Sequence, residues 1–141
     1  MKTLYLKLIE LLSEIPELKY IDLNCGQLQE EKPPIAYPAV LINMNSDSED
    51  IDKLFQNNDG IFELTIVCKL LSESNSNAPE DVRVRSLKYL ELSDSIWKKL
   101  QGYSDNELEN FSRKKTRDVN IRKGLKTCVQ TYETSWKEEN R

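Results

Sequence analysis

The sequence predicts an α+β domain with two helices on one face of a mainly antiparallel sheet of four to five strands, in the order α-β-β-β-α-β-β. Three observations predict this class. Residues 60–71 alternate apolar and polar side chains, residues 2–14 carry an apolar stripe with helical spacing, and Lys123-Gly124 separates two strand-like runs near the end. At 141 residues the chain suits one domain, 1–141, with a core that needs no disulfides.

The first helix is predicted from Lys2 to Glu14, and Pro16 ends it. Its stripe recurs at helical spacing and consists of Leu4, Leu8, Leu11, Leu12 and Ile15. We expect this stripe to cover a hydrophobic surface made by the sheet. A helix lying on a membrane surface is the alternative, but the polar face is not enriched in Lys and Arg.

Two strands are expected next, at residues 19–23 and 36–44. An exposed link rich in charge and proline, residues 29–34, joins them. The second run is almost continuously apolar, which fits a strand covered on both faces or one whose outer face meets another subunit. Pro38 places the start of this strand at an edge or an unpaired position.

Residues 45–59 are predicted to be a polar connection. They contain an acidic cluster made of Asp47, Glu49, Asp50 and Asp52. A calcium loop of the EF-hand type is the alternative reading, but this loop lacks the glycine that the pattern requires. Leu54 and Phe55 then either tuck under the loop or project to a partner, so they are our candidates for an apolar interface.

Gly60 to Leu71 is the predicted central strand, begun by a cluster of turn-forming residues at 57–60. A loop over 71–81 leads to a second helix from Pro79 or Glu80 to Gln101, ended by Gly102. The apolar residues expected to anchor that helix are Val84, Leu87, Leu90, Ile96, Trp97 and Leu100. Ser104 and Glu107 have capping-box spacing, which allows one short helical turn there.

A C-terminal hairpin is predicted with strands at 113–122 and 125–136. Neither face of its second strand is cleanly apolar, which suits one face against the helices and one face or edge used for assembly. The charged tail, 137–141, is expected to be frayed.

Enzymatic chemistry finds little support in the composition. The chain has no histidine, and its four glycines form no phosphate-binding loop. Its acidic residues do not converge as a carboxylate pair. We therefore predict no enzyme, no catalytic residues, no cofactor and no metal. An enzyme with an unrecognised carboxylate site stays as a remote alternative.

The spacing of the cysteines and the lengths of the apolar runs indicate where in the cell the protein is located. Cys25, Cys68 and Cys128 show no CxxC spacing, and the last two lie in strand-like runs, where a cysteine is usually a small buried hydrophobe. No apolar run approaches the roughly 20 residues of a membrane span. We expect a soluble, intracellular protein with no membrane contact.

Charge is unevenly distributed along the chain. The net charge is −4, yet residues 111–126 carry seven basic side chains and one acidic one, a local charge of +6. Such a run can be a solvated hairpin face, a contact with the acidic surface of a neighbouring subunit, or a nucleic-acid site. Nucleic acid is disfavoured, because Phe111 is the only aromatic residue of the run. Residues 1–60 carry −6 and residues 101–141 carry +2, so copies of the protein can attract one another.

The element order at this length resembles small phage tail-terminator and tail-completion proteins. The blocks 15–23, 26–28, 37–42 and 100–105 look like an uncharacterised family of proteins found in prophage-like gene clusters. These blocks begin Ile-Pro-Glu-Leu, Gly-Gln-Leu, Tyr-Pro-Ala-Val and Leu-Gln-Gly-Tyr. The likeness covers most of the chain and carries no catalytic motif.

This resemblance implies a subunit that forms a homo-oligomeric ring and contacts tail-tube or head-tail connector proteins. It also implies a location in the cytoplasm of a bacterial host or in a virion. From the residues of this chain, the expected electrostatic contact is Arg113, Lys114, Lys115 and Arg117, and the expected apolar contact is Leu54 with Phe55. The alternative function is a small nucleic-acid-binding or regulatory module that uses the basic 113–126 hairpin.

Overall fold

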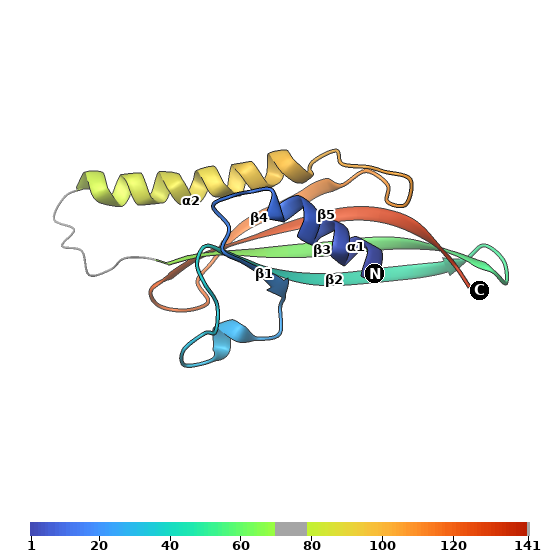
Figure 1. Ribbon diagram of the computed structural model, residues 1–141, viewed down its shortest axis with the longest axis horizontal. Coiled ribbons are helices and arrows are strands. Elements are labelled where there is room, and N and C mark those ends of the chain that lie inside the picture. The colour runs from blue at the N-terminus through green and yellow to red at the C-terminus, as the bar shows by residue number, and fades with distance from the viewer. Residues whose placement is uncertain (70–78, 141) are drawn as a thin grey trace.

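The structure, a computed structural model, describes residues 1–69 and 79–140 and confirms the predicted fold class and element order (Figure 1). Both helices lie on the same face of one five-stranded sheet. The elements are α1 (Lys2–Ser13), β1 (Tyr20–Leu23), the 3-10 helix η1 (Gln27–Gln29), β2 (Ala39–Asp50), β3 (Phe55–Lys69), α2 (Pro79–Leu100), β4 (Ser112–Val119) and β5 (Leu125–Glu139).

The strand order in the sheet is β1-β2-β3-β5-β4. β1 pairs with β2 in parallel, and the other three pairings are antiparallel. β3 and β5 are 15 residues each and pair along their whole length. These two long strands therefore form the centre of the fold. The described part of the strand expected from Gly60 to Leu71 is the last ten residues of β3.

The helix-covered face of the sheet contains the main core. The apolar stripe of α1 and the inner residues of α2 pack there against alternate residues of β2, β3 and β5. At its centre the Phe62 ring stacks on Tyr132, with centroids 5.0 Å apart, and meets the edge of Phe111 at 5.1 Å. The predicted covering role of the first helix is confirmed.

A smaller cluster lies on the opposite face, at the start of β2. Ala39 and Leu41 are fully buried there beneath residues of the 24–38 segment. The prediction that this apolar strand is covered on both faces is confirmed for residues 39–42. Arg122 also fastens the 24–38 segment, because its guanidinium donates to the carbonyl of Leu28 at 3.1 Å and to those of Glu30 and Glu31.

The predicted polar connection at 45–59 is wrong, and so is the turn at 57–60. β2 continues to Asp50 and β3 begins at Phe55, so the turn is only residues 51–54. Asp52 holds it, with Oδ1 accepting from the amides of Leu54 at 2.7 Å and Phe55 at 3.0 Å. Pairing with β2 on one side and β5 on the other overrides the weak strand propensity of the Asn, Asp and Gly residues.

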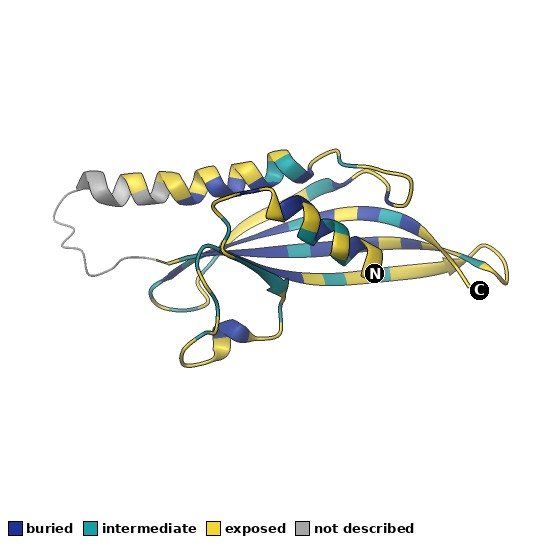
Figure 2. Ribbon diagram, in the orientation of Figure 1, coloured by how far each residue is buried: buried dark blue, intermediate teal, exposed yellow. Residues whose placement is uncertain are grey.

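The anchoring residues predicted for α2 are correct only in its second half. Ile96 and Leu100 are buried, together with Tyr89 and Leu92, which the sequence pattern did not single out. Val84, Leu87 and Leu90 are exposed, because helical spacing places them away from the side of α2 that buries Tyr89, Leu92 and Ile96. The start of α2 also extends past the other elements (Figures 1 and 2). Gly102 follows the helix with φ +78°, as expected for a glycine that ends a helix.

Three further expectations need correction. β4 ends at Val119, so the expected strand over 120–122 is part of the loop that closes at Gly124, whose φ is +86°.

No helical turn follows Gly102; instead Asp105 accepts from the amides of Glu107 at 2.7 Å and Leu108 at 2.8 Å. β5 continues to Glu139, where it pairs with Phe55, so residues 137–139 are not a frayed tail. The strand end expected at 70–71 and the loop from 71 to 78 lie outside the described residues.

Gly60 provides a test of the sheet. A Cβ at this position would lie 2.8 Å from Cη2 of Trp136 and still closer to Cζ3, so the indole covers the glycine. We predict that Gly60→Ala destabilises the protein by about 1–3 kcal/mol through overpacking, although removing a strand glycine normally stabilises by roughly 0.5–1 kcal/mol. Urea unfolding measures this. Trp136→Leu in the Gly60→Ala background should recover part of the loss, and strictly additive effects would contradict the contact.

Candidate assembly surfaces

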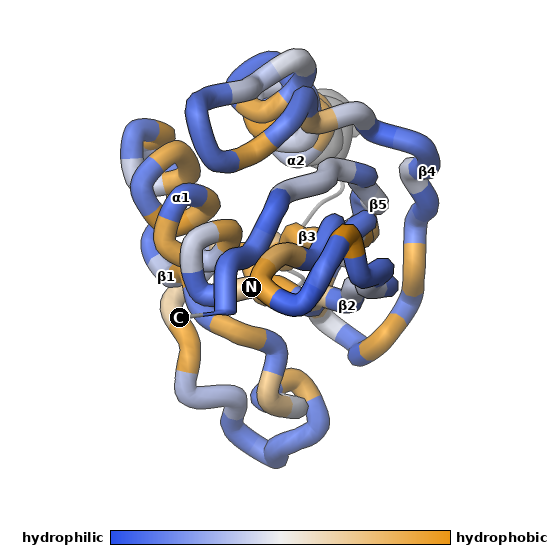
Figure 3. Tube along the Cα trace, turned by 90° about the vertical axis from the view of Figure 1, so that its right-hand side faces the viewer, coloured by the Kyte–Doolittle hydropathy of each residue, from blue (hydrophilic) through white to orange (hydrophobic). Residues whose placement is uncertain are grey.

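The sheet has two exposed edges. β4 forms one edge and pairs only with β5. On the other side β1 pairs with only four residues of the 12-residue β2, namely 39–42. Among the described residues no strand pairs with the outer side of β2 over 43–50, so backbone donors and acceptors are exposed at both edges. Figure 3 shows β4 and β1 on opposite sides of the molecule.

β4 contains all four basic residues of the predicted electrostatic contact, but the sheet divides them. Arg113 lies opposite Tyr132 on the helix-covered face, and its guanidinium lies over the Trp97 ring, 4.8 Å from the centroid. A β-bulge follows at Lys114, and Lys115 then lies opposite Thr131 on the other face. Arg113 therefore contacts α2 within its own chain, on the face of the sheet opposite Lys115.

Lys114, Lys115 and Arg117 remain as the exposed cations of this edge. Within the described part of the chain, Lys115 and Arg117 form no ion pair, whereas Lys114 Nζ lies 4.0 Å from Glu133 Oε2. Both partners of that pair are about half exposed, so we expect it to contribute at most about 1 kcal/mol. The structure thus places three of the four predicted basic residues together on one side of the edge.

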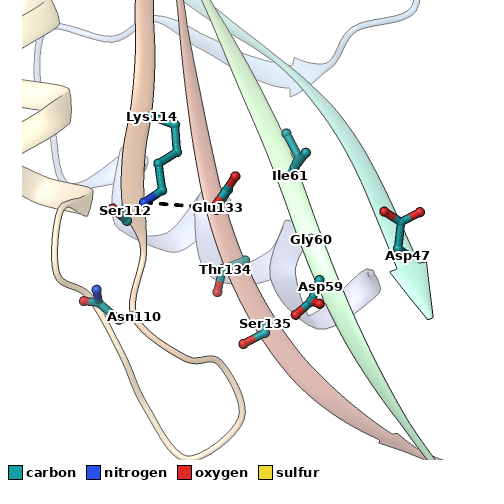
Figure 4. Close-up of a pocket in the computed structure, with 10 residues that line it drawn as sticks. All are labelled: Asp47, Asp59, Gly60, Ile61, Asn110, Ser112, Lys114, Glu133, Thr134 and Ser135. Atoms are coloured by element: carbon teal, nitrogen blue, oxygen red, sulfur yellow. Dashed lines mark ion pairs between the residues drawn. The ribbon is translucent and has the colours of Figure 1, made fainter. Parts of the chain in front are cut away.

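A pocket of about 510 Å³ lies on the open face beside β4 (Figure 4). Lys114 and Glu133 line one side, and Asp47 with Asp59 lines the other. Asp47 and Asp59 are directly opposite each other on β2 and β3, and neither has an ion pair among the described residues. Like charges in such cross-strand positions repel each other, so this pair destabilises the isolated chain.

The outer segment of β2 is the acidic counterpart of β4. Residues 43–50 contain Asp47, Glu49 and Asp50 and no basic side chain, a charge of −3. Sequence reasoning missed this surface, because it assigned these residues to a loop. The uneven charge of the first 60 residues was the available signal.

Leu54 and Phe55, the predicted apolar contact, lie where the β2–β3 hairpin turns. Leu54 is 51% exposed and Ile51 beside it is 49% exposed, while Phe55 is partly buried. Leu54 therefore projects and does not tuck under the loop. The exposed apolar side chains of this hairpin tip are Ile51 and Leu54, at the end of the molecule that also carries the C-terminus (Figure 1).

Near this end of the molecule, hydrogen bonds lower the pKa of two carboxylates, Glu138 and Asp105. The indole N–H of Trp136 donates to Glu138 at 2.9 Å and holds the pKa of that carboxyl below its usual value. The amides of Leu108 and Glu107 do the same for the pKa of Asp105. Both carboxylates are occupied in fixing loops and strand ends, so they belong to the scaffold.

The described residues were also searched for a reactive thiol, a metal site and a membrane-spanning helix. Burial raises the pKa of the Cys68 thiol to about 11, which leaves little thiolate at neutral pH. Within residues 1–69 and 79–140, no three His, Cys, Asp or Glu side chains gather as a metal site. No helix in those ranges is long and apolar enough to span a membrane.

Comparison with solved structures shows a likeness of fold, whereas the sequence comparisons find none. No family model matches the chain, and a search of curated proteins finds no match. Among solved structures, the chain is similar to one in a structure described as the virion of the native gene transfer agent (GTA) particle. The superposition covers 94% of this chain and 84% of that chain, with a TM-score of 0.50 and 11% sequence identity. At this identity the likeness is one of fold.

The division of the basic residues can be tested by charge reversal. We predict that Arg113→Glu destabilises the monomer by about 0.5–2 kcal/mol, because the cation over Trp97 is lost. Lys115→Glu is the matched control on the same strand and should change the unfolding free energy by less than about 0.5 kcal/mol, since its side chain is exposed. Urea unfolding followed by Trp fluorescence measures both. Equal effects of the two changes would contradict the placement of Arg113.

Proposed function

We propose that the protein is a non-enzymatic structural component of a phage-like virion. In this role it is of the tail-terminator or tail-completion type, forms a ring and contacts tail-tube or connector subunits. The observation that carries this proposal is the likeness of fold, over nearly the whole chain, to a chain of a gene transfer agent virion. Such a function requires contact surfaces for other subunits, and the described residues provide candidates at the two sheet edges and at the hairpin tip.

The basic edge supports self-association. Lys114, Lys115 and Arg117 are exposed on β4, two of them have no partner in the described chain, and the acidic edge lies on the far side of the sheet. A patch and its complement on opposite sides of one subunit form a heterologous contact, which generates a ring when the rotation closes. This arrangement supports a ring more directly than it supports a two-fold dimer.

The hairpin tip supports a contact with a different subunit. Ile51 and Leu54 extend beyond the helices at the end of the long β2–β3 hairpin (Figure 2). Exposed apolar side chains at such a tip suit insertion into a neighbouring surface. In a ring the tips of all subunits lie on one rim, where a tail tube or connector is met.

A nucleic-acid module is the second candidate, favoured by the same three cations on an exposed strand. It is weakened by the adjoining face, where Asp47, Asp59 and Glu133 surround Lys114 in the pocket and repel phosphates. Indifference to single- and double-stranded DNA at about 100 mM salt is the result that we expect. Binding that falls steeply with salt, and that Lys114→Glu/Lys115→Glu abolishes, would support the second candidate.

Self-association is tested by sedimentation across a wide concentration range. We predict a large closed species at high concentration, visible as a ring by electron microscopy, that dissociates as salt screens the charged edges. Lys114→Glu/Lys115→Glu should shift the protein toward monomer. A strict monomer under every condition would remove autonomous ring formation from the proposal.

The apolar tip is tested separately in a host whose own copy of the gene is deleted. We predict that Leu54→Asp leaves the sedimentation of the purified protein unchanged but lowers the yield of complete particles at least about tenfold, since it removes an apolar contact with another subunit. Lys53→Asp, next to it in the turn, is the control for an added charge. Normal particle yield with Leu54→Asp would exclude the tip as a contact.

A further inference from the structure

The two exposed edges of the sheet match in length and oppose in charge. β4 has 8 residues, and four of the 12 residues of β2 pair with β1, which leaves 8. Ser112–Val119 carries +3 and 43–50 carries −3. We infer that β4 of one copy adds to residues 43–50 of β2 in the next, so that one sheet continues from subunit to subunit. This inference rests on the self-association proposed above and specifies its interface.

Strand direction is compatible with this addition. β4 is antiparallel to β5, β5 to β3, and β3 to β2, so β4 and β2 run in opposite directions within one sheet. A second copy placed beside the first in the same orientation therefore brings β4 against β2 as an antiparallel pair. That continues the alternation of the central strands, and antiparallel edge addition is a common mode of strand pairing between chains.

Register follows from the position of β1. Within one sheet, Ser112 shares a row with Asn45 through Glu133 and Ile61. Residues 39–42 are occupied by β1, so the incoming β4 must shift along the strand until Ser112 lies near Asp50. This is a stagger of five residues, about 17 Å. A stagger repeated at every interface tilts the strands relative to the assembly axis, as in barrels.

Cross-strand chemistry favours this register. Matching the two 8-residue stretches end to end places Asp47 opposite Lys115 of the next copy, and both side chains lie on the open face. Asp47 already faces Asp59 within its own chain and has no ion pair among the described residues. An incoming Lys115 would relieve this repulsion, and Lys115 in turn would gain the partner that its own chain does not supply.

The charges also exclude the symmetric alternatives. Two β4 edges would bring like-charged lysines together, and two β2 edges would bring together Asp47, Glu49 and Asp50 of both copies. Lysines and a bulge on an edge strand are common protection against such pairing. Only the unlike edges attract, so the contact is heterologous and assembly proceeds head to tail.

The test uses two charge-reversed variants of the full chain, Lys114→Glu/Lys115→Glu and Asp47→Lys/Glu49→Lys. At a concentration where the native protein is assembled, each variant alone should sediment as monomer, with association weakened on the order of tenfold or more. Mixed in equal amounts they should assemble again in alternation, because each supplies the edge that the other needs. The combined fourfold variant should assemble alone. Lys88→Glu/Lys98→Glu on the exposed side of α2 is the control for Lys114→Glu/Lys115→Glu, because it makes the same change in net charge.

Separate outcomes distinguish this inference from the proposed function. If the native protein assembles and both reversed variants also assemble, the edge pairing is wrong while ring formation stands. If each variant fails and neither mixing nor the fourfold change restores assembly, the edges do not pair with each other. If the native protein is monomeric at every concentration, the inference and autonomous ring formation both fail. Circular dichroism and urea unfolding of each variant establish that it is folded.

Discussion

The full-length pairing of β3 with β5 is the constraint on which the rest of the structure depends. It extends over 15 residues and assigns alternate side chains to opposite faces. One face receives Phe62, Tyr132 and Ile66 and is closed by the helices, whereas the other face keeps Asp59, Ile61 and Glu133 open. Because this ladder pairs the backbone groups of the central strands, the unpaired edges of the described sheet are β4 on one side and, on the other, the four-residue β1 with residues 43–50 of β2.

A single inserted residue divides the basic side chains of β4 between the two faces of the sheet. The bulge at Lys114 turns Arg113 toward Trp97 and Lys115 toward the open face. The two residues are two positions apart, which in a regular strand would put both on the same face. One cation therefore contacts α2, and its neighbours Lys114 and Lys115 are exposed. The acidic outer segment of β2 provides the complementary charge on the opposite side of the same sheet.

Patterns with a strong period were predictable from sequence, and those set by distant contacts were not. The α1 stripe and the alternation of residues 62–68 each bury one face, so their elements followed from spacing. Gly60 had the composition of a turn, and nothing local shows that Trp136, 76 positions later, covers it in a strand. For the candidate surface, composition identified the basic residues of β4, but no local pattern revealed the bulge or the strand character of residues 45–50.

Hydrogen exchange of the backbone amides, compared between the assembled and the dilute protein, tests the edge-to-edge account most directly. Outward-facing amides in Asn43–Asp50 and Ser112–Val119 should exchange rapidly in the dilute protein and become protected on assembly, because strand addition gives each an acceptor. Amides of the central strands should be protected in both states. Protection that appears on assembly only in α2 or at the hairpin tip, with both edges still exchanging rapidly, would contradict the account.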